Sequence, residues 1–186
     1  MYNDSFIDEV SNLLNAHQKS FSKKLYSEKE SDNDILMDVF GISTELRQEN
    51  LQYWNGQLGR IWESLVCLIF KYYGEYYQPA LKIGLDQPCD LINHNDAIDT
   101  KYRIGSGDSG TLKKLKQYGK LLISKGYSPV LLILRNDNLH RAIQSCKTGG
   151  WTILAGDDAI NYIINNTGIN PIEVLNIFKD QCIISR

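Results

Sequence analysis

The spacing of apolar residues predicts helices in the first third of the chain and a helix–strand alternation after it. Apolar residues recur three and four positions apart between Gln52 and Tyr73, which predicts one long helix that ends near Gly74. A shorter pattern that starts at Phe6, and another over residues 35–40, predict that residues 1–50 form a helical N-terminal segment. The broad apolar face of the long helix consists of Leu58, Ile61, Trp62, Leu65, Val66 and Ile69.

Short apolar runs bounded by turn-forming residues predict strands over about 77–85, 88–92 and 97–104. The order helix, three-stranded meander, helix, strand is typical of an α/β fold with a mixed central sheet, and the later alternation indicates parallel pairing. Residues 51–186 are expected to form this domain. Its later elements are a helix over about 111–125, a strand from Pro129 to Leu134, a helix over about 137–147, a strand from Trp151 to Leu154 and a helix begun by Asp157-Asp158.

Two carboxylates face each other if the strands around residues 93–96 form a hairpin. With 93–96 as its loop, residue 92 pairs with 97, residue 91 with 98, and Asp90 with Asp99. Like charges directly opposite each other are destabilising, so we expect a cation between them. Lys101, two residues beyond Asp99, projects from the same face of the strand. This arrangement predicts a Mg²⁺ site with an adjacent ammonium, a combination suited to hydrolysis of phosphodiester bonds.

Glu63, on the border of the apolar face of the long helix, is a candidate third carboxylate for this site. Taken alone it would be interpreted as a boundary glutamate that points to water; beside Asp90 and Asp99 the site role is favoured. The stretch 105–111 is rich in glycine and hydroxyl residues, and could be a phosphate-binding nest or, slightly favoured, a flexible connector. The next helix carries one polar face, which is either solvated or positions phosphates, and Gln117 could reach the site from it. That face consists of Lys113, Lys116, Gln117 and Lys120.

Charge is distributed unevenly along the 186 residues, a length that fits one domain with a sizeable core. Residues 99–147 carry ten Lys and Arg against three Asp and Glu, whereas the whole chain has a net charge of −2. The basic segment can hold phosphates locally. A chain of net charge −2 lacks the strong general attraction of a self-sufficient DNA-binding protein. We therefore expect another component to bring this chain to its polyanion.

The N-terminus and the cysteines indicate a cytoplasmic protein that does not enter a membrane. Met1-Tyr2-Asn3-Asp4 lacks the basic and apolar regions of a signal peptide, and no apolar run reaches membrane-spanning length. The cysteines at positions 67, 89, 146 and 182 have no paired ligand spacing. Free thiols in a reducing compartment are expected, and a zinc site is not.

Glu63, Pro88-x-Asp90 and Asp99-x-Lys101, in the order helix, hairpin and helix, resemble the PD-(D/E)xK nuclease superfamily over roughly residues 55–155. The resemblance implies a restriction-endonuclease-like αβββαβ core. It implies that Asp90, Asp99 and the main-chain carbonyl of Thr100 hold Mg²⁺, for which Mn²⁺ can substitute. Lys101 would position or activate water, Glu63 would assist, and Gln117 is a plausible helper on the following helix.

The length, the missing DNA-recognition domain and the acidic N-terminal segment are similar to the small catalytic subunit of a heterodimeric type IIS restriction endonuclease. In such enzymes a large subunit recognises the sequence and nicks one strand, while the small subunit cuts the other. The resemblance implies a site-specific deoxyribonuclease subunit that acts on double-stranded DNA with a larger partner, for which residues 1–50 are a possible docking segment. Two alternatives stay open: a stand-alone repair or junction-resolving nuclease of the same fold, and a non-catalytic assembly subunit.

Overall fold

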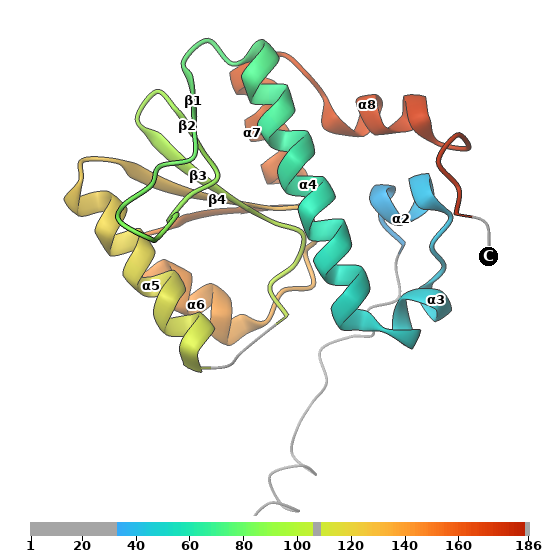
Figure 1. The fold of residues 1–186 in the computed structure, drawn as a ribbon, viewed down its shortest axis with the longest axis horizontal. Helices are drawn as coiled ribbons and strands as arrows, with labels where there is room; N and C mark the ends of the chain where they lie inside the picture. Colours follow the sequence, from blue (N-terminus) through green and yellow to red (C-terminus); the bar gives the residue numbers. More distant parts are fainter. Residues whose placement is uncertain (1–32, 106–108, 185–186) are drawn as a thin grey trace, which may run out of the picture. The chain divides into compact units, whose positions relative to one another are not determined.

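A five-stranded mixed sheet lies at the centre of residues 32–186, of which the computed structural model describes 33–105 and 109–184 (Figure 1). The strand order is β1-β2-β3-β4-β5; the first three strands pair antiparallel, and β4 and β5 extend the sheet in parallel. The expected α/β fold with a mixed sheet and parallel later strands is confirmed. The strands are β1 (Tyr77–Pro79), β2 (Leu91–Asn93), β3 (Asp96–Lys101), β4 (Ser128–Ile133) and β5 (Thr152–Ala155).

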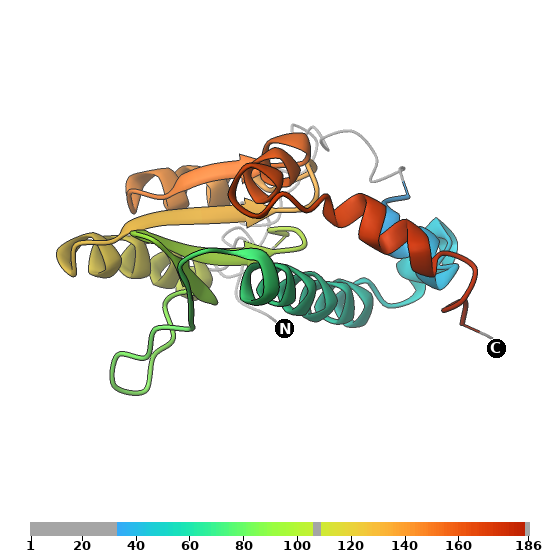
Figure 2. The same ribbon diagram turned by 90° about the horizontal axis from the view of Figure 1, so that it is seen from above.

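Helices cover both faces of the sheet, because alternate residues of its central strands are apolar on both sides (Figures 1 and 2). On one face α4 (Leu51–Tyr73) and α7 (Asp157–Thr167) pack on Ile98 and Leu132. On the other face α5 (Ser109–Ser124) and α6 (His140–Thr148) pack on Ala97 and Leu131. No helix in the described part of the chain is long and apolar enough to cross a membrane.

Three short helices complete the described part: α2 (Ile35–Phe40), α3 (Thr44–Glu49) and α8 (Pro171–Phe178). Asp34 caps α2, since its Oδ1 accepts hydrogen bonds from the first main-chain N–H groups of that helix. The helix predicted over 35–40 is confirmed, and it belongs to the same unit as the sheet. Residues 1–32 of the predicted N-terminal helical segment lie outside the described residues.

The first predicted strand, over about 77–85, is shorter in the structure, and the predicted hairpin loop over residues 93–96 is wrong. β1 ends at Pro79 instead of extending to residue 85. Asn93 and Asp96 pair across the hairpin, so the turn consists of His94 and Asn95 alone, with His94 at φ +52°. The pairs 91–98 and 92–97 follow the predicted register. The third predicted pair, Asp90 with Asp99, lies outside the ladder.

Candidate active site

Asp90 lies just before β2, and its carboxylate is held against β3. Its main-chain N–H donates a hydrogen bond of 2.8 Å to the carbonyl oxygen of Ile98. Its Oδ2 accepts two hydrogen bonds from Thr100, one of 2.7 Å from the main-chain N–H and one of 2.8 Å from the hydroxyl. The main-chain N–H of Thr100 therefore bonds to the side chain of Asp90 instead of to a main-chain carbonyl of β2, and the β2–β3 ladder ends here. Within the described residues Oδ1 of Asp90 accepts no hydrogen bond, so it is free to bind a ligand.

Asp99 and Lys101 lie two residues apart on β3 and form a close ion pair. The Nζ of Lys101 lies 2.6 Å from Oδ2 of Asp99, and it also donates a hydrogen bond of 2.9 Å to the main-chain carbonyl of Thr100. Asp99 is buried, whereas the side chain of Lys101 keeps 37% of its surface exposed. The pair thus joins a buried carboxylate to a cation that reaches solvent.

Burial and mutual repulsion shift the protonation of the acidic groups. Burial raises the pKa of the Asp99 carboxyl to about 6; Lys101 opposes this shift, and Asp90 and Glu63 add to it. Burial also raises the pKa of Glu63, with a further rise from Asp90 and an opposing effect of Lys101. Burial alone would lower the pKa of Lys101, but the carboxylates of Asp99 and Asp90 raise it above the ordinary lysine value. Four of the predicted site residues therefore act on one another electrostatically.

Two carboxylates and a main-chain carbonyl form a set of hard oxygen donors, the kind of ligand that Mg²⁺ and Mn²⁺ prefer. These donors belong to Asp90, Asp99 and Thr100, and the ammonium of Lys101 already bridges two of them. No group of three or more His, Cys, Asp and Glu side chains is placed to hold a metal ion within residues 33–105 and 109–184. The donor set fits Mg²⁺, which usually binds one or two protein carboxylates and keeps several water ligands.

Gln117 is the one predicted site residue that the structure does not bring to this cluster. It is exposed on α5, and in the described part of the chain no hydrogen bond joins it to the other site residues. The predicted phosphate-binding stretch 105–111 is described only in part, since residues 106–108 lie outside the described residues.

Three cysteines, predicted from the sequence only to be free thiols, lie near the cluster. All four cysteines of the chain are free. The thiol of Cys67 lies 3.9 Å from the main-chain carbonyl of Asp90, and burial, together with the nearby Asp90 and Glu63, raises its pKa to about 12. Burial also raises the pKa of Cys89, and it raises that of Cys146 to about 11; Asp99 adds to both shifts. These thiols stay protonated at neutral pH and pack as small apolar side chains, Cys67 on one face of the sheet and Cys89 and Cys146 on the other.

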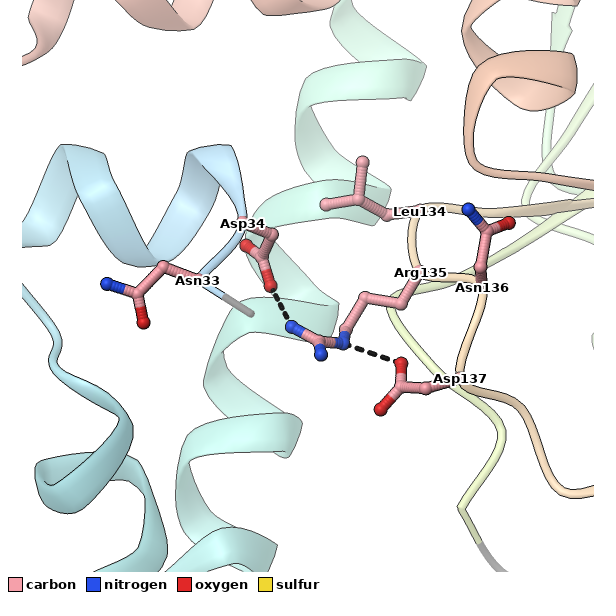
Figure 3. Close-up of a pocket in the computed structure, with 6 residues that line it drawn as sticks. All are labelled: Asn33, Asp34, Leu134, Arg135, Asn136 and Asp137. Carbon is pink, nitrogen blue, oxygen red and sulfur yellow. Dashed lines mark hydrogen bonds and ion pairs between the residues drawn. The ribbon is translucent and has the colours of Figure 1, made fainter. Parts of the chain in front are cut away.

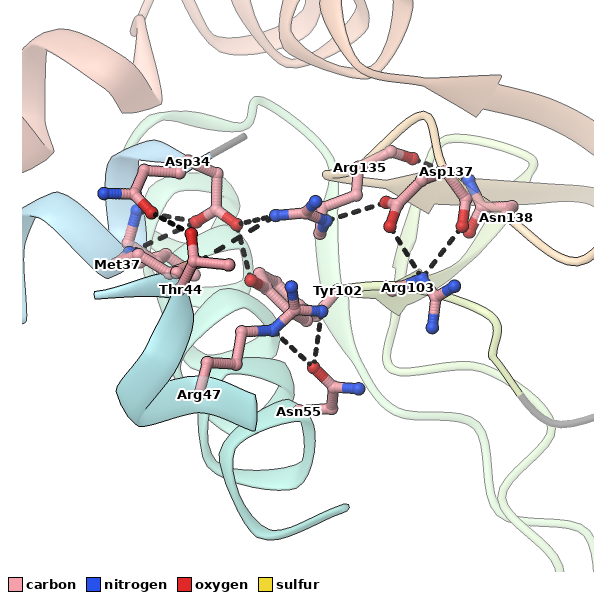
Figure 4. Close-up of polar contacts among 12 residues, drawn as sticks. Asp34, Met37, Thr44, Arg47, Asn55, Tyr102, Arg103, Arg135, Asp137 and Asn138 are labelled. Atoms are coloured by element: carbon pink, nitrogen blue, oxygen red, sulfur yellow. Dashed lines mark hydrogen bonds and ion pairs between the residues drawn. The ribbon is translucent and has the colours of Figure 1, made fainter. Parts of the chain in front are cut away.

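A buried polar network holds the end of β3 directly after Lys101 (Figure 4). The hydroxyl of Tyr102 donates a hydrogen bond to Oδ2 of Asp34, and Nη1 of Arg135 lies 2.6 Å from the same oxygen. The Nε of Arg135 lies 2.7 Å from Oδ1 of Asp137, whose Oδ2 lies 2.9 Å from Nε of Arg103. The sequence does not predict this network, because bonded members such as Asp34 and Arg135 lie 101 positions apart and no local pattern marks them.

The network borders a pocket of about 240 Å³ that lies beyond the end of β4 (Figure 3). Its charged groups already pair with one another: Arg135 lies between Asp34 and Asp137. We therefore interpret this region as the junction that fixes α2 to the sheet. The pocket is lined by Asn33, Asp34, Leu134, Arg135, Asn136 and Asp137.

Comparison of the chain with known proteins finds no matching family model, no matching curated protein and no matching solved structure.

Proposed function

We propose that this chain is a Mg²⁺-dependent endonuclease subunit with a restriction-endonuclease-like, PD-(D/E)xK core. The order α4, β1, β2, β3, α5, β4 agrees with the αβββαβ arrangement of that superfamily. The observation that carries the proposal is the meeting of Asp90, Asp99 and Lys101 around the main-chain carbonyl of Thr100. In this cluster a free carboxylate oxygen of Asp90, the buried acid Asp99 and the cation of Lys101 lie together.

The residues of the cluster have separable roles in phosphodiester hydrolysis. Asp90, Asp99 and the carbonyl of Thr100 would hold Mg²⁺, which when bound supplies positive charge against the phosphate and makes an attacking water more acidic. The ammonium of Lys101, partly exposed, would orient that water or offset the charge that develops on the phosphate oxygens. Glu63, whose pKa burial and Asp90 raise above the ordinary glutamate value, would accept a proton or hold a second water.

A single site of this kind cuts one strand of double-stranded DNA, so a double-strand break needs a second site. We propose that a larger, sequence-recognising subunit supplies that second site, as in heterodimeric type IIS restriction endonucleases. The charge distribution supports this view: a basic segment of limited length lies in a chain of net charge −2, which favours local phosphate contacts over independent DNA capture.

The experiment that tests the proposal is plasmid cleavage with Mg²⁺, by the chain alone and together with its candidate large subunit. The variants are wild type, Asp99→Ala, and Asp157→Ala as a matched control, since Asp157 is an exposed aspartate on α7. Double-strand breaks with wild type and Asp157→Ala, and only nicks with Asp99→Ala, are expected when the large subunit is present. Structure-selective cutting by the chain alone would indicate a repair nuclease. Cleavage that is equal with Asp99→Ala would exclude the assigned site.

A further inference from the structure

The connection between β1 and β2 contains a tight turn with an exposed leucine at its tip. Ile83 and Asp86 exchange two main-chain hydrogen bonds, of 2.9 and 3.1 Å, which makes Gly84 and Leu85 the central residues of a small hairpin. Gly84 has φ +63°, which a two-residue hairpin turn with glycine first requires. Leu85 has a relative exposure of 107%, the highest among the exposed large apolar residues of the described chain. Figure 2 shows this connection projecting away from the sheet.

Contacts with α5 and with the core fix the position of this turn. The hydroxyl of Tyr118 on α5 donates a hydrogen bond of 2.6 Å to Oδ1 of Asp86. The ammonium of Lys114 lies 5.2 Å from the centre of the Tyr118 ring. At one end of the connection Leu81 packs on the core, and at the other end Cys89 is fully buried. Single exposed leucines are common on protein surfaces. Leu85 differs because the contacts of Tyr118, Leu81 and Cys89 fix the turn that exposes it.

The surface beside the turn is positively charged and hollow. A pocket of about 360 Å³ is lined by Leu81, Lys82, Ile83, Lys125 and Tyr127. Lys82 and Lys125 are both exposed, and Lys114 adds a third ammonium near the turn. The Asp86 carboxylate, which accepts the Tyr118 hydrogen bond, carries one negative charge against the three lysines, so the surface beside the turn keeps a net positive charge. A surface of this kind is complementary to a polyanion.

We propose that the turn and its pocket form a DNA-contact surface: Lys82 and Lys125 hold backbone phosphates, and Leu85 packs against bases in a groove of the duplex. DNA as the partner rests on the proposed function. Phosphate contacts set the position of a protein on DNA, and apolar side chains that enter a groove pack against base steps. Since Asp90 follows the same connection, the contact would align the duplex with the site at β3.

The test is the binding of the full chain to a fluorescent duplex DNA at several KCl concentrations, without divalent metal so that cleavage cannot occur. The double variant Lys82→Gln, Lys125→Gln should reduce the slope of log K against log[salt] by roughly 1.8, about 0.9 for each phosphate that is no longer neutralised. Leu85→Ser should weaken binding about tenfold and leave the slope unchanged, because it removes an apolar side chain without removing charge.

Matched controls remove two positive charges, or one exposed apolar side chain, elsewhere on the described surface. Arg60→Gln with Lys71→Gln removes two exposed charges from α4, and Ile177→Ser removes an exposed apolar side chain from α8. Test variants that bind no more weakly than these controls would overturn the inference, as would a wild-type chain that does not bind DNA at low salt. Mg²⁺-dependent cleavage, measured in parallel, separates the two proposals. A chain that binds through this surface but does not cut even with the large subunit present would refute the nuclease and keep the surface.

Discussion

The ammonium of Lys101 donates a hydrogen bond of 2.9 Å to the main-chain carbonyl oxygen of Thr100, the residue before it on β3. The same ammonium lies 2.6 Å from Oδ2 of Asp99. Both acceptors belong to the donor set proposed for Mg²⁺, so the lysine and the metal ion compete for the same oxygen atoms. We expect the ammonium of Lys101 to leave the carbonyl of Thr100 when a metal ion binds. The ammonium would then be free to contact water and phosphate.

Replacing Lys101 with methionine should therefore tighten Mn²⁺ binding while abolishing DNA cleavage. The expected gain in affinity is roughly tenfold, because two unit charges about 4 Å apart interact by about 1 kcal/mol even in bulk water, and the metal ion carries two charges. Calorimetric titration with Mn²⁺ at pH 8, above the pKa of Asp99, measures the change. Lys113→Met, which removes an exposed lysine from α5, is the matched control. Weaker Mn²⁺ binding by Lys101→Met would contradict the competition.

Mn²⁺ affinity should fall as the pH drops through about 6, where burial places the pKa of Asp99. Below that pH the carboxyl of Asp99 carries a proton that must leave when the metal binds, so the affinity should fall about tenfold for each further pH unit. Above pH 6 the affinity should level off. Titrations between pH 5 and pH 8 test this expectation, and a constant affinity over that range would argue against Asp99 as a ligand.

Thr100→Val should destabilise the fold by about 1–2 kcal/mol, because Oδ2 of Asp90 then loses the hydroxyl donor and keeps only the main-chain N–H of residue 100. Valine preserves the shape and the strand preference of threonine. Urea denaturation measures the loss. Thr100→Ser retains the hydroxyl and serves as the control, so equal losses in both variants would mean that the hydrogen bond contributes nothing.

Asp34→Ala should lower the free energy of unfolding by about 3 kcal/mol, because it removes one partner of the buried Arg135 and the cap of α2 together. Asp38→Ala removes a carboxylate from the same helix. The Nζ of its partner Lys179 lies 3.6 Å from Oδ2 of Asp38 and both side chains are partly exposed, so this control should lose less than about 1 kcal/mol. Similar losses in the two variants would show that the buried network does not hold α2 to the sheet.

The long helix, the parallel later strands and most of the hairpin register could be predicted from the sequence, because each depends on local apolar periodicity. The hairpin turn could not. Asn93 is buried, and its Nδ2 donates to Asn166 on α7. Asp96 accepts a hydrogen bond from Tyr162 on the same helix. These distant partners bond the Nδ2 of Asn93 and the carboxylate of Asp96, two residue types that are otherwise typical of loops, and the strands extend by one residue each.

The candidate site is predictable as a set because Asp90, Asp99 and Lys101 lie within twelve positions around one hairpin. The contacts among these residues are not predictable from the sequence. The hairpin pattern predicts a direct pairing of Asp90 with Asp99, but the Asp90 carboxylate bonds instead to the main-chain N–H and hydroxyl of Thr100. Helix α8 is absent from the predicted elements although Asn170, its cap, precedes Pro171 at the first turn, which is a recognised start signal.

The most direct test of the central claim is a calorimetric titration of the purified chain with Mn²⁺ at pH 8. The proteins compared are wild type, Asp99→Asn and Asp157→Asn. Our account predicts saturable binding to wild type and Asp157→Asn, and at least roughly tenfold weaker binding to Asp99→Asn, since even residues that only support metal ligands have effects of that size. Binding that is equal in all three proteins would contradict a metal site at Asp90, Asp99 and Thr100.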